Sequence, residues 1–273
     1  MDRVAVYCGT RNLYRDMQTA AKSLLYHNRM DRVYFITEDS EHPDLNGLPD
    51  IFTVINVSGQ QYFDPSGPNY ASPWSYMAYI RLALCKILPD VHRILYLDAD
   101  TVVLDDISPL LDMDMTGKLF AMVREDVGEI TMEQIKAFSV SGDTLVPFQT
   151  DSARPPFPVR PYYNSGVMLM NLDEFKRDGT DDRLIEELNT VKHAYPDQDI
   201  VNIFCAGRIV TLPQEYNVIP AIVPDFPLSE IKIRHFASDK PVWKHSVWQK
   251  YRKMSWQEVM ERKERIRTAQ NGP

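Results

Sequence analysis

The sequence contains few cysteines and no long apolar run. Only Cys8, Cys85 and Cys205 are cysteines among the 273 residues, and they lie far apart. Three scattered cysteines do not make a disulfide framework or a cysteine-rich zinc site, so a reducing, cytoplasmic location is expected. The first residues show no basic stretch followed by an apolar one, so no signal peptide is expected. No apolar segment approaches the roughly 20 residues of a transmembrane helix, which leaves only peripheral membrane contact.

The chain as a whole also lacks positive charge. It has 30 Lys and Arg against 38 Asp and Glu, a formal net charge of −8. Nucleic-acid coats need a basic surface, so we expect no nucleic-acid partner. The charge is uneven, because residues 240–273 carry +6 and the remainder −14. With 44% hydrophobic residues the chain can bury a large core, which excludes wholesale disorder.

Strand-like and helix-like segments alternate along the chain. The predicted strands cover residues 4–8, 32–37, 51–57, 93–97 and 163–171. The predicted helices cover residues 13–25, 75–88 and 182–193. This alternation predicts an α/β fold with a mainly parallel sheet. Residues 139–161 carry five prolines, which predicts a long irregular loop that is either a binding loop or a solvated insertion.

Two aspartates follow the apolar strand at 93–97 directly. Asp98 and Asp100 are separated by one residue, so on an extended chain they point the same way. Ligands of open α/β sheets bind beyond the carboxyl ends of the strands. Two carboxylates at such an edge attract a hard cation such as Mn²⁺ or Mg²⁺. The pairs Asp112/Asp114 and Asp197/Asp199 have the same spacing but do not follow such a strand, so a surface turn is their simpler interpretation.

Two classes of enzyme place an Asp-x-Asp pair at the end of an apolar strand. Haloacid-dehalogenase-like phosphatases use the first aspartate as a nucleophile, but that motif usually lies near the N-terminus and precedes a Gly-Asp-x-x-x-Asp segment. Here the pair lies near residue 100 and no such segment is found. The second class comprises the nucleotide-sugar glycosyltransferases of the GT-A fold.

Five motifs in order make the chain resemble glycosyltransferase family 8, which includes glycogenin and bacterial lipopolysaccharide galactosyl- and glucosyltransferases. The resemblance covers roughly residues 3 to 243. The motifs are Tyr-x-Arg-Leu at 79–82, Tyr-Leu-Asp-x-Asp at 96–100, Asn-Ser-Gly-Val with a following Asn-Leu at 164–172, Asp-Gln-Asp-x-x-Asn at 197–202, and His-Phe at 235–236.

The resemblance implies a GT-A fold, a single Rossmann-like nucleotide-sugar-binding domain over residues 1–243. It implies a retaining hexosyltransferase that moves glucose or galactose from UDP-glucose or UDP-galactose to a glycan, a lipid-linked saccharide or a protein. Asp98, Asp100 and His235 would hold Mn²⁺, with Mg²⁺ as the alternative. The metal would neutralise charge on the departing UDP.

The resemblance also implies roles for further residues. Thr10 and Asn12 would bind uracil or ribose, and Tyr14 would stack on the base. The residues implied for the rest of the nucleotide sugar are Arg81, Ala99, Asn164, Ser165, Ser238 and Lys240. Ser238 stands where the family commonly has Gly, and Lys240 comes one residue early, which puts its role in doubt.

Arg81, Asp197 and Gln198 are the implied catalytic residues, and Glu125, Asp126 and Asp199 the implied acceptor-binding residues. Gln198 occupies the position of a nucleophile for double displacement, but an amide oxygen is a poor nucleophile. Front-face substitution therefore fits better, although the sequence leaves both mechanisms open.

Residues 244–273 form a basic tail rich in aromatic residues. Ser255 and Glu258 fit a capping box, which predicts a helix from that point. Such a helix could lie on the anionic inner face of a membrane. It could equally pack on the domain with its basic face in water. Besides the transferase, a phosphatase and a non-catalytic nucleotide-sugar-binding protein remain as alternative functions.

Overall fold

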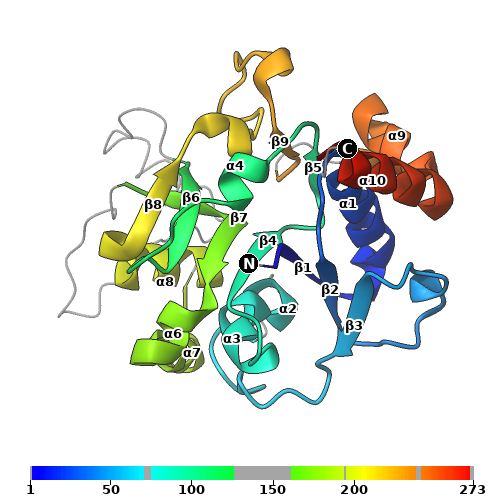
Figure 1. Ribbon diagram of the computed structural model, residues 1–273. Coiled ribbons are helices and arrows are strands. Elements are labelled where there is room, and N and C mark those ends of the chain that lie inside the picture. The colour runs from blue at the N-terminus through cyan, green and yellow to red at the C-terminus, as the bar shows by residue number, and fades with distance from the viewer. Residues whose placement is uncertain (1, 71–74, 126–160, 194, 238–240, 271–273) are drawn as a thin grey trace.

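A seven-stranded sheet organises the computed structural model (Figure 1), which describes residues 2–70, 75–125, 161–193, 195–237 and 241–270. Within these residues the strand order is β3-β2-β1-β4-β7-β6-β8, and β5 pairs with β9 in a separate two-stranded sheet. The strands are β1 Val4–Gly9, β2 Arg32–Thr37, β3 Phe52–Asn56, β4 Arg93–Leu97, β5 Thr101–Val103, β6 Phe120–Arg124, β7 Tyr163–Asn171, β8 Ile209–Leu212 and β9 Ile233–His235.

The large sheet is mainly parallel, as predicted. β1, β2, β3 and β4 run parallel to one another, and β6 runs parallel to β8. Only β7 is antiparallel to its neighbours β4 and β6 among these pairings. The carboxyl ends of β1 and β4 therefore lie at one edge of the sheet, where ligands of α/β folds bind.

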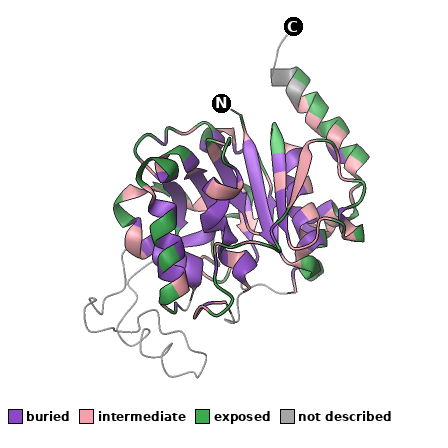
Figure 2. Cartoon of the chain, turned by 90° about the horizontal axis from the view of Figure 1, so that it is seen from below, coloured by how far each residue is buried: buried purple, intermediate pink, exposed green. Residues whose placement is uncertain are grey.

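Helices cover both faces of this sheet. They are α1 Tyr14–His27, α2 Tyr76–Tyr79, α3 Leu84–Ile87, α4 Ser108–Leu111, α6 Leu172–Asp178, α7 Thr180–Thr190, α8 Pro196–Phe204, α9 Ser246–Lys253 and α10 Trp256–Gln270. Side chains alternate along a strand, so successive residues of β1 pack into the cores on opposite faces of the sheet. Val6 packs in the core that includes α2, α3 and α6–α8, and Tyr7 in the core that includes α1 and α4. In Figure 2 the strands are largely buried and the helices expose their outer sides.

The predicted helix at 75–88 is wrong in one respect, because it is interrupted. A 3₁₀ segment, Ile80–Ala83, separates α2 from α3. Within it the guanidinium of Arg81 donates from Nε to the carbonyl oxygen of Ala78. Short 3₁₀ stretches inside helices often mark functional positions. Here the Arg81 side chain of the 3₁₀ segment is directed toward Asp98, at the carboxyl end of β4.

The small sheet joins segments that are far apart in sequence. β5 and β9 are antiparallel, and Thr101 pairs with His235. The backbone N–H of Phe236 donates to the carbonyl of Asp100 at 2.9 Å. This pairing brings the end of β9 against the loop that follows β4.

The C-terminal helices pack on the rest of the chain. Trp248 and Tyr251 of α9 are buried in a cluster with Val102 and Phe236, and Val259 of α10 is buried in the core beside α1. Side-chain exposure increases along α10 beyond Val259, where this helix extends from the body (Figure 2). The described tail is therefore packed on the domain, and the division at residue 243 stays a sequence-based prediction.

The capping box at the start of α10 is present. Ser255 donates from its backbone N–H to Glu258 Oε2 at 2.7 Å, and the Glu258 N–H donates to Ser255 Oγ at 3.2 Å. None of the described helices has the length and apolar character needed to span a bilayer. Almost all of the proline-rich segment at 139–161 lies outside the described residues.

Candidate metal and nucleotide-sugar site

Asp98 and Asp100 lie in the turn that joins β4 to β5. The Asp98 backbone N–H donates to the Gly166 carbonyl at 2.8 Å and so continues the pairing of β4 with β7. Thr101 donates from Oγ1 to the Asp98 carbonyl at 2.8 Å, which fixes the turn. Both aspartates are partly exposed at the carboxyl edge of the sheet.

His235 faces this pair from the end of β9. Its Nε2 lies 3.7 Å from Asp98 Oδ2 and 3.3 Å from Asp100 Oδ1. One ligand atom from each of the three residues lies within 4.8 Å of the others. Burial acts to lower the pKa of His235, but Asp100 and Asp98 outweigh it and raise that pKa above its ordinary value. The structure thus brings together the three residues predicted as metal ligands.

Gly166 makes this approach of His235 and Asp98 possible. A Cβ at Gly166 would lie 2.2 Å from His235 Cε1 and 2.8 Å from Asp98 Oδ2. Even alanine would therefore displace His235 or Asp98. The glycine of the Asn-Ser-Gly-Val motif is explained by this lack of space rather than by an unusual backbone angle, because its φ is not in the left-handed region.

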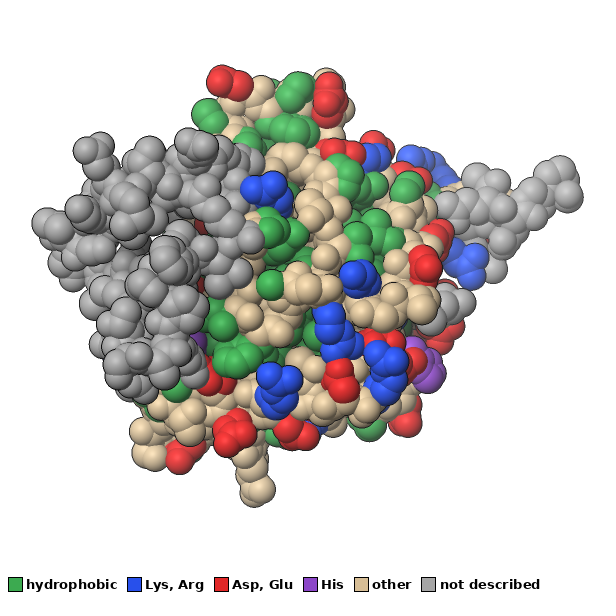
Figure 3. All heavy atoms as spheres, turned by 90° about the vertical axis from the view of Figure 1, so that its left-hand side faces the viewer, with side chains coloured by type: hydrophobic (Ala, Val, Ile, Leu, Met, Phe, Trp, Pro, Cys, Tyr) green, Lys and Arg blue, Asp and Glu red, His purple; other side chains and the backbone are tan. Residues whose placement is uncertain are grey.

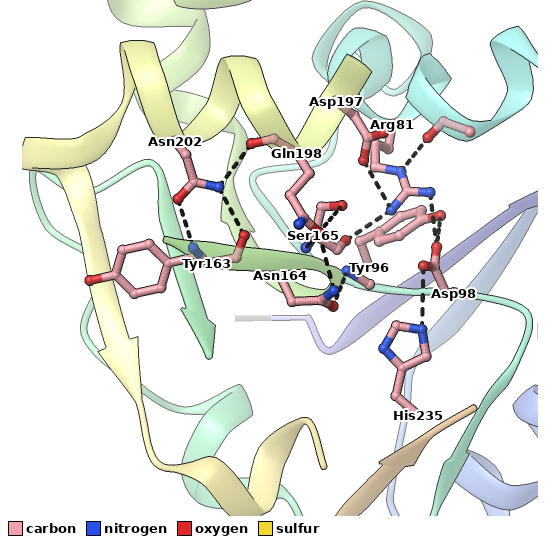
Figure 4. A network of polar contacts seen from close by, with 12 residues as sticks. Arg81, Tyr96, Asp98, Tyr163, Asn164, Ser165, Asp197, Gln198, Asn202 and His235 are labelled. Atoms are coloured by element: carbon pink, nitrogen blue, oxygen red, sulfur yellow. Dashed lines mark hydrogen bonds and ion pairs between the residues drawn. The ribbon is translucent and has the colours of Figure 1, made fainter. Parts of the chain in front are cut away.

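Arg81 is a buried cation between two carboxylates. Its Nη2 lies 2.9 Å from Asp98 Oδ1, its Nη1 lies 3.4 Å from Asp197 Oδ2, and Nη1 also donates to the Ser165 carbonyl at 2.9 Å. The guanidinium stacks 4.2 Å from the Tyr96 ring centroid. Figure 4 shows Asp197 and Asp98 on either side of this guanidinium.

Arg81 and Asp197 shift each other's pKa. Burial acts to lower the pKa of Arg81, but Asp197 and Asp98 raise it, so the guanidinium stays charged. Burial raises the pKa of Asp197, and Arg81 opposes this shift. Within the described part of the chain, Asp197 Oδ2 accepts no hydrogen bond, so its ion pair with Arg81 is its main compensation.

Gln198 and Asn164 form a network of amides beside the candidate metal ligands (Figure 4). Gln198 Oε1 accepts from the Ser165 N–H at 3.0 Å and from Asn164 Nδ2 at 3.1 Å. Glu125 Oε2 accepts from Gln198 Nε2 at 2.7 Å and from Asn164 Nδ2 at 3.1 Å. Asn202 ties α8 to β7, since its Nδ2 donates to the Tyr163 carbonyl at 2.8 Å. The amide of Gln198 is thereby held in one orientation.

The sequence analysis did not single out Asn217, which joins this network. Asn217 Oδ1 lies 3.0 Å from His235 Nδ1, and its Nδ2 donates to Asn164 Oδ1 at 2.8 Å. The Val218 N–H donates to the Ile233 carbonyl, which holds this segment alongside β9. The sequence offers only the dipeptide Tyr216-Asn217, between the segments that form β8 and β9, as a signal for Asn217. Such a dipeptide is too common to indicate a site.

The predicted nucleotide-binding end is assembled only in part. Thr10 and Asn12 lie at the carboxyl end of β1, where Thr10 Oγ1 donates to Asn12 Oδ1. Ala99 is buried between the two aspartates. Tyr14 corrects our expectation of a stacking residue, because its ring is 0% exposed. Its hydroxyl accepts from the Glu38 N–H at 3.0 Å, so Tyr14 supports a loop instead of offering a face to a base.

The predicted acceptor residues differ in their placement. Glu125 is partly exposed next to Gln198 and Asn164. Asp199 is 2% exposed, and its carboxylate accepts from the Tyr162 hydroxyl at 2.7 Å and the Tyr195 N–H at 3.0 Å, which are structural contacts. The residues that lie outside the described part of the chain are Asp126, Ser238 and Lys240.

Comparison with known proteins finds likenesses of sequence and of fold. The chain is 33% identical over 156 residues to a lipopolysaccharide 1,2-glucosyltransferase of Escherichia coli K12, which covers 55% of this chain and 40% of that protein. The chain spans about two fifths of the length of the first curated relatives that it matches.

Two solved structures show the same fold. The glycosyltransferase GlyE of Streptococcus pneumoniae TIGR4 superposes with a TM-score of 0.65 at 19% identity, over 96% of this chain and 62% of GlyE. The galactosyltransferase LgtC, solved with donor and acceptor sugar analogs, superposes with a TM-score of 0.55 at 17% identity, over 95% of this chain and 99% of LgtC. The fold is therefore GT-A, as the sequence predicted.

The profile described as Glycosyl transferase family 8 matches residues 4–245, nearly the whole chain. This range contains the five sequence motifs, the cluster of Asp98, Asp100 and His235, and also Arg81 and Gln198. The chain belongs to glycosyltransferase family 8.

Proposed function

We propose that this chain transfers glucose or galactose, with retention, from UDP-glucose or UDP-galactose to a saccharide-bearing acceptor. The proposal depends on one observation, the cluster of Asp98, Asp100 and His235 beside Arg81 at the carboxyl edge of the sheet. The named relatives support both hexoses, since one is a glucosyltransferase and another a galactosyltransferase. A glycan, a lipid-linked saccharide and a protein remain the candidate acceptors.

The residues at the cluster fit a divalent cation. Two carboxylates and one imidazole are a donor set suited to Mn²⁺, with Mg²⁺ as the alternative. The absence of a side chain at Gly166 leaves the imidazole and the Asp98 carboxylate in close approach, which a Cβ would prevent. A bound cation would supply Lewis-acid stabilisation of the charge that grows on the departing diphosphate.

The buried guanidinium of Arg81 serves the same end of the donor. It carries a permanent charge beside Asp98, in a position to attract a diphosphate or the hydroxyls of the donor sugar. Asp197 lies on the other side of the guanidinium, and we assign it to the sugar hydroxyls. Thr10 and Asn12, at the end of β1, would contact the uridine.

The contacts of Gln198 favour front-face substitution over double displacement. Its Oε1 already accepts hydrogen bonds from Ser165 and Asn164, and an engaged amide oxygen is a still poorer nucleophile. In front-face substitution the bond from the anomeric carbon to UDP breaks as the acceptor oxygen attacks from the same side. The acceptor proton passes to the departing phosphate oxygen. Gln198 would then orient the sugar, and Glu125 would contact the acceptor.

A panel of nucleotide sugars tests the proposal. With Mn²⁺ or Mg²⁺ present, UDP-glucose or UDP-galactose should raise the melting temperature and release UDP when an acceptor is added. Asp98→Asn and Asp100→Asn should abolish both effects, and full activity in either variant would refute the metal assignment. A phosphatase would instead hydrolyse phosphate monoesters and ignore UDP. A non-catalytic binder would show the melting shift without release of UDP.

For the tail, the packing of α9 and α10 supports attachment to the domain more than peripheral contact with a membrane surface. Trp248 and Tyr251, two aromatic residues that could have anchored it, are buried against Phe236 and Val102. Acidic and basic side chains are interspersed on the face drawn in Figure 3, in the lower part where Figure 1 places α6 and α7. Flotation with anionic vesicles, with and without residues 244–273, separates the two alternatives. Loss of flotation on removal would favour peripheral membrane contact.

A further inference from the structure

Asn217 is a buried amide whose two ends contact different parts of the site. It is 1% exposed and directly precedes Val218, which pairs with Arg234 of β9. One end meets His235, and the other meets Asn164. Neither the sequence motifs nor the family match assigns it a role.

The orientation of Asn217 follows from a chain of hydrogen bonds that starts at a backbone donor. The Gly166 N–H donates to Asn164 at 2.9 Å, so the acceptor there must be the amide oxygen Oδ1. Asn217 also approaches this oxygen, at 2.8 Å, and must therefore donate to it through Nδ2. Its own oxygen, Oδ1, is left facing His235 Nδ1 at 3.0 Å.

An amide oxygen can only accept a hydrogen bond, so Nδ1 of His235 must carry a proton. In a neutral imidazole the other nitrogen then has its lone pair free. That nitrogen, Nε2, is the one that faces Asp98 and Asp100. Histidine ligands of metals are commonly held in one tautomer by such a partner on the second ring nitrogen.

We propose that Asn217 is a positioning residue that holds His235 in the Nδ1–H tautomer and so presents Nε2 to the cation. The inference rests on the metal site of the proposed function. Asn164 links this role to Gln198, because Asn164 accepts from Asn217 and donates to Gln198. A change at Asn217 should therefore act on metal affinity first and on turnover through it.

The chain offers a matched control in Asn69. It is also 1% exposed, its Nδ2 donates to the carbonyls of Leu188 and Val191 at 2.7 Å each, and its Oδ1 accepts from the His193 N–H at 2.9 Å. The side chain of Asn69 thus makes three hydrogen bonds, against two for that of Asn217, and none of these three reaches the site. Leucine at either position removes the polar atoms at similar volume.

The first measurement is Mn²⁺ affinity of the full chain without donor, followed by the paramagnetic resonance of free Mn²⁺. Asn217→Leu should weaken binding about 10- to 100-fold, the usual effect of removing such a partner. Asn217→Asp keeps an acceptor for Nδ1–H and should recover much of this loss. Asn69→Leu should bind as the wild type does. Equal affinity of folded Asn217→Leu and wild type would overturn the inference.

The second measurement is the ring-nitrogen NMR spectrum of His235 in the metal-free wild type, at a pH above its titration. The Nδ1–H tautomer is expected, and the Nε2–H tautomer would overturn the inference even if Asn217→Leu failed to fold. This result does not depend on metal binding. If the wild type showed the expected tautomer but bound no Mn²⁺, the metal assignment of the proposed function would fail on its own.

Discussion

At the scale of single residues, Gly166 shows how the lack of a side chain can be required by two others. Its motif was readable in the sequence, but the reason was not, because His235 lies 69 positions further along the chain. The same holds for Asn217, whose partner becomes visible only when β9 is in place. Local spacing predicted Asp98 and Asp100 as a pair, whereas His235 came from the family resemblance.

Gly166→Ala should therefore impair the site more than the fold. The added Cβ overlaps with His235 Cε1 and Asp98 Oδ2, and overpacking of this kind costs about 1–3 kcal/mol of unfolding free energy. Displacing His235 should lower Mn²⁺ affinity and transfer at least 10-fold. Titration calorimetry with Mn²⁺ measures the first effect and UDP release the second. Gly59→Ala is the control, since a Cβ there meets nothing within 4 Å. Unchanged Mn²⁺ affinity in Gly166→Ala would contradict the explanation.

Arg81 provides a prediction about stability. Arg81→Met should lower the free energy of unfolding by about 3–5 kcal/mol, because it leaves the carboxylate of Asp197 buried without its cation. The double variant Arg81→Met, Asp197→Asn should recover part of this loss. Urea unfolding is the measurement. Arg11→Met is the control, because the Arg11 side chain is 65% exposed in its ion pair with the partly exposed Asp39, and such a surface pair should contribute less than about 1 kcal/mol. A loss at Arg81 as small as that at Arg11 would disprove the buried-pair argument.

At the scale of elements, the five predicted strands were placed accurately, whereas β5, β6, β8 and β9 were not predicted. The bounds of β2, β4 and β7 agree with the sequence analysis, because continuous apolar runs with sharp polar ends define buried strands. The break between α2 and α3 was not predicted, because the residues across it, Arg81 apart, are as apolar as a continuous buried helix would be. The pairing of β5 with β9 was also missed, because it joins distant segments with three residues each.

The junction of α1 with α9 should respond to acid. Burial, followed by the nearby charge of Lys250, lowers the pKa of His27 to about 4 from an ordinary value of 6.5. His27 Nε2 lies 2.8 Å from the Tyr251 hydroxyl of α9. Between these two values the unfolded chain binds a proton that the folded chain resists. The stabilisation is therefore complete above pH 6.5 and is lost as the pH falls toward 4.

Urea midpoints at pH 7, 5.5 and 4 measure this loss. His27→Gln keeps a polar group toward Tyr251 but does not titrate, so its midpoint should fall less than that of the wild type over the same range. An equal fall in both proteins would exclude His27 as the titrating group.

At the scale of the whole molecule, the basic tail is coupled to the acidic site through packing. Phe236 directly follows His235, the proposed metal ligand, and its N–H donates to the Asp100 carbonyl. The Phe236 ring contacts the Trp248 ring edge-to-face, with centroids 5.7 Å apart. The two parts of the chain with opposite charge, which the sequence analysis divided before residue 240, therefore share a hydrophobic cluster.

Trp248→Ala should therefore affect both stability and metal binding. Removing a fully buried tryptophan costs about 3–5 kcal/mol of unfolding free energy, and the cavity would free Phe236 to move together with His235. Mn²⁺ affinity, measured well below the melting temperature of the variant, should fall as well. Trp243→Ala removes a side chain that is 58% exposed and should change stability by less than about 0.5 kcal/mol. If Trp248→Ala were destabilised but bound Mn²⁺ like the wild type, the tail would stabilise the domain without supporting the site.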